Sequence, residues 1–160
     1  MNEAYLQKII QAKKNGRRTK RTISQLRKLR KGEVDRQIHN LHQKAFAEID
    51  CLACANCCKT TGPLLVPKDI SRMAHQLNIS AQDFIDSYLK IDEDNDYIFK
   101  SMPCPFLGDD NYCTVYEFRP KACREYPHTD RVNQLGILKL TEKNAVICPA
   151  VAQIFESLDK

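Results

Sequence analysis

Apolar residues in the first third of the chain recur at helical spacing, with intervals of three and four residues between neighbours. This periodicity is typical of amphipathic helices that bury one face. Because Gly16 and Gly32 interrupt the pattern, we predict three helices in this region. The stripe residues are Tyr5, Leu6, Ile9, Ile10, Ile23, Leu26, Leu29, Val34, Ile38, Leu41, Ala45 and Ile49.

The pattern after residue 49 predicts shorter elements. Pro67 suits the first turn of one helix, and Ser80 suits the N-cap of the next. Residues 97–99 and 137–140 read as short strands, and Pro149 opens a last helix. We therefore expect a mostly helical α+β fold, in which a small cysteine-rich, metal-centred domain follows an N-terminal helical extension.

Charge divides the chain in the same place. Residues 1–44 hold 13 Lys and Arg against three acidic residues, a balance of +10, whereas residues 45–160 hold 12 basic and 17 acidic residues, a balance of −5. Such asymmetry is typical of different structural units. We predict a basic helical arm over residues 1–48 and a cysteine-cluster metal-binding domain over residues 49–160.

The basic residues of the arm, in positions 8–36, allow two interpretations. They could contact an acidic partner or nucleic acid, or they could form a solvated helix face, which is the commoner role of a charge run. No aromatic residue is interleaved with them to stack on bases. The partner therefore stays open at this stage.

The chain shows no signal peptide at its start and no apolar run of the roughly 20 residues that cross a bilayer. We accordingly expect a cytoplasmic protein without membrane contact. In a reducing compartment eight cysteines indicate metal ligands or redox groups rather than disulfides.

Four of the cysteines stand within eight residues, and the run Cys-x-x-Cys-x-x-Cys suits a chain that curls around a metal. We expect the side chains of Cys57 and Cys58 to diverge, so that they serve neighbouring sites or only one of them binds. The candidate metal ligands are Cys51, Cys54, Cys57, Cys58, Cys104, Cys113, Cys123 and Cys148.

The identity of the metal stays open. Cys104 and Cys148 each precede proline, and a remote Cys-Pro completes ferredoxin-type runs, which favours an iron–sulfur cluster or iron. Eight thiolates also make two four-cysteine zinc sites, so zinc is the alternative. Arg119, Arg124, Tyr116 and Tyr126 are candidates to surround the metal ligands.

No catalytic constellation is visible, because the five glycines are isolated and no nucleophile–base set stands in a known local context. The sequence favours a metal-binding protein for iron handling, redox chemistry or electron transfer. One alternative is a group-transfer enzyme, or an accessory subunit, that uses the cluster. Another is a nucleic-acid-associated protein with structural zinc.

Four motifs in order resemble the YkgJ-type CxxCxxCC cysteine-cluster family, which is described as zinc- or iron-chelating. They are the run 51–58, Cys-Pro-Phe-Leu at 104–107, the segment 113–127 with its Arg-Pro and Tyr-Pro pairs, and Cys148-Pro149. The same motif in flagellin lysine methylases would imply a 4Fe-4S cluster. This chain is much shorter than those enzymes, so the resemblance does not imply their activity.

Overall fold

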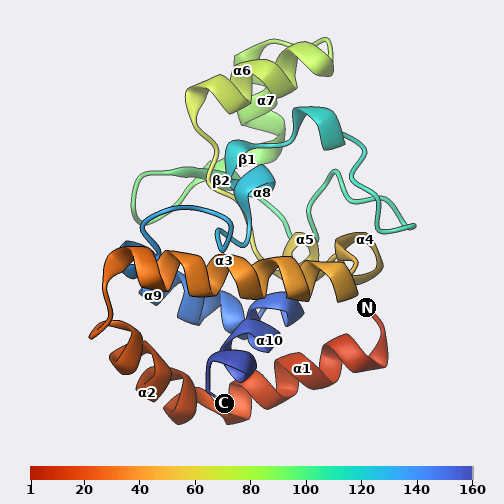
Figure 1. Ribbon diagram of the computed structural model, residues 1–160. Coiled ribbons are helices and arrows are strands. Elements are labelled where there is room, and N and C mark those ends of the chain that lie inside the picture. Colours follow the sequence, from red (N-terminus) through yellow and green to blue (C-terminus); the bar gives the residue numbers. More distant parts are fainter. Residues whose placement is uncertain (160) are drawn as a thin grey trace. The chain divides into compact units, whose positions relative to one another are not determined.

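A computed structural model describes residues 1–159 of the chain. Contacts divide it into two compact units (Figure 1). The first, here called the helical unit, consists of Met1–Cys54 together with the described residues from Pro127 onward. The second, the loop-rich unit, is Ala55–Tyr126.

The helical unit is built from α1 (Glu3–Lys14), α2 (Gly16–Leu26), α3 (Lys31–Glu48), α4 (Cys51–Cys54), α9 (Gln134–Ala145) and α10 (Pro149–Leu158). Helix α10 packs against α3, α1 and α9, and α3 also packs against α9 (Figure 1). Val34, Ile38, Leu138, Val151 and Ile154 are almost completely buried in this unit. The three predicted N-terminal helices are present, with Gly16 and Gly32 in the first turns of α2 and α3.

The strand predicted at residues 137–140 is wrong, because this segment lies inside helix α9. Its buried residues include Leu138, Thr141 and Ala145, a helical spacing that the short apolar run conceals. The Asp35 carboxylate of α3 accepts the backbone N–H groups of Asn133 and Gln134, at 2.9 and 2.8 Å. A side chain almost 100 residues away thus caps the start of α9.

The loop-rich unit contains α5 (Asn56–Thr60), α6 (Pro67–Gln76), α7 (Ala81–Tyr88), β1 (Leu89–Ile91), β2 (Tyr97–Phe99), the 3₁₀-helix η1 (Tyr116–Phe118) and α8 (Lys121–Glu125). Strands β1 and β2 form an antiparallel pair in which Leu89 faces Phe99. The predicted helix starts are confirmed: Pro67 opens α6, and the Ser80 hydroxyl accepts the backbone N–H of Asp83 at 3.0 Å. The fold is therefore a mostly helical α+β fold, as predicted.

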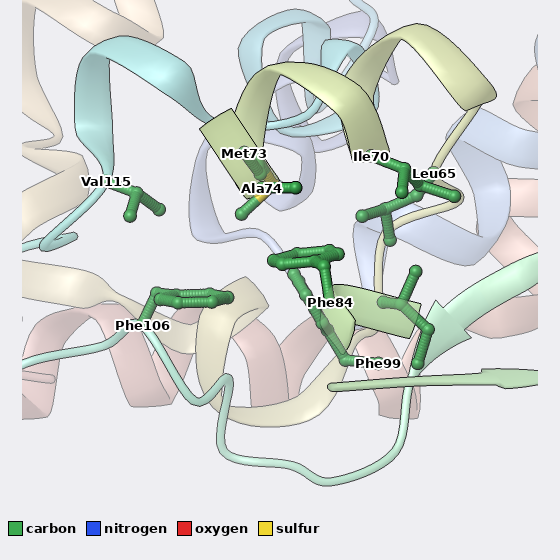
Figure 2. Close-up of a cluster of buried hydrophobic side chains, with 9 residues drawn as sticks. Leu65, Ile70, Met73, Ala74, Phe84, Phe99, Phe106 and Val115 are labelled. Carbon is green, nitrogen blue, oxygen red and sulfur yellow. The ribbon is translucent and has the colours of Figure 1, made fainter. Parts of the chain in front are cut away.

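Figure 2 shows the apolar core of the loop-rich unit, which contains nine buried residues. Phe84 and Phe106 stack with their ring centroids 6.2 Å apart, and Phe99 meets Phe106 edge-on at 5.7 Å. Cys104 and Cys113 pack against this cluster. The core therefore holds two of the predicted ligands at its edge, where they are partly withdrawn from water.

The division predicted at residue 48 stays a prediction about independent folding. By contacts, α9 and α10 group with α1–α3, so the basic helices share their core with the C-terminal helices. None of the helices in residues 1–159 combines the length and apolar composition that crossing a bilayer requires.

Candidate metal centre

The cysteine run is folded as two short helices with a break between them. Helix α4 ends at Cys54, and Ala55 adopts a left-handed conformation (φ 48°) before α5 begins. The start of the run is anchored within the helical unit, because the Asp50 N–H donates to the Tyr5 hydroxyl at 2.9 Å. The break therefore separates Cys51 and Cys54 from Cys57 and Cys58 along the chain.

The helical unit contains the three thiols of Cys51, Cys54 and Cys148. Cys148 is the N-cap residue of α10 and is 8% exposed. The charges of Cys51 and Cys54 act on Cys148 and oppose its ionisation. We call Cys51, Cys54 and Cys148 the three-thiol group.

The N-cap position does not give Cys148 the low pKa expected of a thiol at a helix N-terminus. Burial raises the pKa of Cys148 to about 12, and the charges of Cys51 and Cys54 act in the same direction. The backbone N–H groups of Val151 and Ala150 favour the thiolate but are outweighed. Desolvation of the charged form exceeds the effect of the helix end here.

The loop-rich unit contains the other five thiols, which we call the five-thiol group: Cys57, Cys58, Cys104, Cys113 and Cys123. The backbone joins their segments. The Cys104 N–H donates to the Cys58 carbonyl at 2.8 Å, and Leu107 forms an antiparallel bridge with Cys113 across a turn at residues 108–111. Cys123 lies on α8.

The sulfur atoms of the adjacent Cys57 and Cys58 lie 3.9 Å apart. The expectation that these side chains diverge is therefore wrong, because the two sulfur atoms are close enough for a hydrogen bond. Two thiolates on one tetrahedral ion with bonds of about 2.3 Å are separated by roughly 3.8 Å. The observed separation is compatible with both sulfurs binding one ion.

Ionisation differs within the five-thiol group. The hydrogen bond with Cys57 lowers the pKa of Cys58 to about 7, with smaller help from Arg119 and Lys59. Burial raises the pKa of Cys104 to about 11 and that of Cys123 to about 12, and it also raises the pKa of Cys113. The charge of Cys58 adds to all three increases.

This donor set fits a cation. Burial and neighbouring thiolates raise the pKa of Cys104, Cys113 and Cys123, so these thiols stay protonated until a positive charge lies among them. A bound metal supplies that charge. Sulfur donors suit zinc, iron and iron–sulfur clusters. Within residues 1–159 no three His, Cys, Asp or Glu side chains lie close enough together to bind one metal ion. The thiols therefore act on one another's pKa over distances longer than those between the ligands of one ion.

Arg119 is the cation that acts on the largest number of thiols in the five-thiol group, since it lowers the pKa of Cys58, Cys113 and Cys123. Its guanidinium carbon lies 3.6 Å from the centroid of the Tyr116 ring. Its Nε is buried and has no hydrogen-bond acceptor within the described residues. Such a donor suits a thiolate or a cluster sulfide.

The other two residues expected around the ligands are less directly placed. Arg124 is exposed and donates to the Arg119 carbonyl at 2.8 Å. Tyr126 is half-buried at the C-cap of α8. Neither is among the groups that shift a cysteine pKa in this unit.

Sequence reasoning missed the residues that hold α8. Asp69 is 1% exposed; its carboxylate pairs with Arg72 at 2.5 Å and accepts the Lys121 N–H at the start of α8 at 3.1 Å. Arg72 also donates to the carbonyls of Phe118 and Arg119. Only the near capping position of Asp69 in α6 could have drawn attention to it.

A comparison with models of protein families identifies the family of the chain. Residues 50–149 match the model of the CxxCxxCC family, described as a putative zinc- or iron-chelating domain. The match covers well over half of the chain, so the chain belongs to this family. It is thus a metal-binding protein of the cysteine-cluster class. Searches of curated proteins and of solved structures gave no match.

Proposed function

We propose that the eight cysteines form two thiolate centres, one in each unit, which hold iron for iron handling, redox chemistry or electron transfer. The observation that carries this proposal is the division of the thiols into a three-thiol and a five-thiol group, each with its own pattern of electrostatic coupling. Reducing conditions in the cytoplasm would keep all eight as thiols rather than disulfides.

The five-thiol group supports a closed centre. It contains more than the four sulfurs that saturate a tetrahedral ion, and Cys57 and Cys58 have the sulfur separation that one ion needs. Arg119, whose charge acts on Cys58, Cys113 and Cys123, has a buried Nε donor without an acceptor among residues 1–159. Metal-bound thiolates and the inorganic sulfide of an iron–sulfur cluster can both accept such a bond, so Arg119 supports a metal centre of either kind.

The three-thiol group supports an open centre. Sites with three protein ligands keep a position for water or substrate, as catalytic metal sites do. Cys51 is exposed, so this position would be reached from solvent. A group-transfer enzyme, or an accessory subunit of one, is therefore the second candidate function, and it depends on this group alone.

Purification without oxygen tests the proposal. We expect brown protein with iron and acid-labile sulfide, and Cys58→Ser should lower both. Ala53→Ser is the matched control, because it places the same hydroxyl on an exposed position in the run without removing a thiol. Colourless protein with stoichiometric zinc would favour a structural role, and less than half an equivalent of any transition metal in folded protein would refute metal binding by the thiols.

A further inference from the structure

Residues 4–32 carry the most concentrated charge in the chain. They contain eleven Lys and Arg and no Asp or Glu. The segment covers α1, α2 and the turn before α3, outside the residues that match the metal-chelating family. Metal binding therefore leaves this segment unexplained.

The structure places these cations on one side of α2. Thr19, Thr22, Ile23 and Leu26 are buried. On the opposite side, Arg17, Lys20, Arg21, Arg27 and Lys28 are exposed. Arg17, Lys20 and Arg21 stand three and four residues apart on α2, so their charges form a stripe along the helix, and Arg27 and Lys28 follow directly after its end.

The stripe is not neutralised within the molecule. Arg18 pairs with the carboxylate of Asp159. No other Lys or Arg of this segment has a carboxylate partner among residues 1–159. Surface cations normally alternate with acids that reduce their mutual repulsion. The mutual repulsion of the cations in residues 4–32 would fall if an external anion bound to them.

Two of these charges lie where the helix dipole disfavours them. Arg17 is in the first turn of α2, which contains no acid, and Arg30 is the N-cap residue of α3. Positive charge at a helix N-terminus opposes the helix dipole, whereas Lys13 and Lys14 in the last turn of α1 are favourably placed. The dipole therefore does not explain Arg17 and Arg30, whereas binding of an anion does.

The chemistry of the stripe favours a phosphodiester chain over a membrane. Helices that lie on membranes expose an apolar face beside the basic one, whereas Ile23 and Leu26 of α2 are buried in the helical unit. Arginine matches phosphate with paired hydrogen bonds. No Phe, Tyr or Trp occurs between residues 6 and 45, so the segment offers no aromatic ring on which a base could stack. Contacts to phosphate alone carry no sequence information.

We propose that the exposed basic face of α2, extended by the neighbouring ends of α1 and α3, binds the phosphate backbone of a nucleic acid without sequence preference. Arg17, Lys20 and Arg21 form its centre. Helix α2 is roughly 16 Å long at 1.5 Å per residue, which spans several successive phosphates of one strand. This binding surface is independent of the thiol centres.

The test uses the full-length protein with its metal as purified. Fluorescence anisotropy would measure its affinity for labelled single-stranded RNA, single-stranded DNA and duplex DNA of one sequence over a range of salt concentrations. The variant is Arg17→Gln/Lys20→Gln/Arg21→Gln. The matched control, Lys68→Gln/Lys90→Gln/Lys139→Gln, removes the same charge from exposed positions elsewhere.

We expect wild-type binding that weakens steeply with salt, by about 0.7–0.9 in the log–log slope for each phosphate contacted. The α2 variant should lose at least about tenfold in affinity at 0.1 M salt and about two units of slope, while the control stays within twofold. A preference among the three probes would identify RNA or DNA as the source of the phosphates.

Absence of binding to all three probes would overturn the proposal, as would equal weakening in the variant and the control. Binding of the same protein to phosphatidylserine vesicles would also be measured. Binding to vesicles without binding to any nucleic acid would show that the stripe is a lipid-binding surface instead.

Discussion

The two units of the chain use hydrophobic residues differently. Apart from the four-residue α4, the helical unit packs helices of 10–18 residues against one another, and its buried positions follow the helical period. The loop-rich unit has elements of only 3–10 residues around a nine-residue apolar core, with thiols at its edge. Units of about 70 residues commonly need a disulfide or a metal to be stable. From this comparison we expect metal to stabilise the loop-rich unit most.

Removing the metal should therefore have the largest effect on stability, and the loop-rich unit should lose more stability than the helical unit. A thiolate-bound metal contributes about 10–16 kcal/mol in zinc-finger peptides, so we expect residues 55–126 to lose most of their amide protection after chelation under reducing conditions. Helices α1–α3, α9 and α10 should retain theirs. Hydrogen exchange with mass spectrometry would measure both regions in one sample, and equal loss of protection in the two units would contradict the comparison.

A cavity in the core of the helical unit should have a smaller effect on stability. The metal content of the protein should not change. Leu138 is 1% exposed and Leu140 is 39% exposed on the same helix α9. Leu138→Ala should lower the free energy of unfolding of this unit by about 2–5 kcal/mol, and the control Leu140→Ala should change it little. Chemical denaturation followed by far-UV circular dichroism would measure the difference. Loss of metal from the loop-rich unit in Leu138→Ala would show that the two units are not energetically independent.

The contrast between the units also explains what could be read from the sequence. Local signals were sufficient where one residue determines a helix start, as Pro67 and Ser80 do, and where apolar stripes are long, as in α3. They failed at Ile137–Leu140, because a short apolar run does not distinguish a strand from a buried helix.

The candidate site shows the same limit. The spacing of the cysteines indicated metal chelation, and the family match confirms that class. The division into a three-thiol and a five-thiol group could not be predicted, because it depends on which unit each segment joins. The anchoring of α8 by Asp69 depends on contacts 52 residues apart, which no local pattern records.

The smallest expected effect concerns the ionisation of Cys58 in metal-free protein. The pKa of Cys58 is lowered to about 7, mainly by the hydrogen bond with Cys57 and less by Arg119. Cys57→Ala should therefore raise this pKa more than Arg119→Gln, and the exposed control Arg124→Gln should leave it unchanged. The pH dependence of iodoacetamide alkylation at Cys58, followed by mass spectrometry, would give all three values.

The sign of the linked stability follows from the same shift. The folded pKa of Cys58 lies below its ordinary value, so Cys58 contributes stability to the metal-free protein above that ordinary value. This contribution is lost as the pH falls through about 7. An alkylation midpoint for Cys58 as high as that of an ordinary cysteine would show that neither neighbour acts on it.

The most direct test of two separate centres is the metal content of Cys123→Ser, Cys148→Ser and the double variant, purified without oxygen beside wild type and Ala53→Ser. Cys123 belongs to the five-thiol group and Cys148 to the three-thiol group. Two centres predict that each single variant retains part of the iron and sulfide, that the two losses add up in the double variant, and that Ala53→Ser matches wild type. Complete loss of metal in both single variants would show instead that all eight thiols serve one centre.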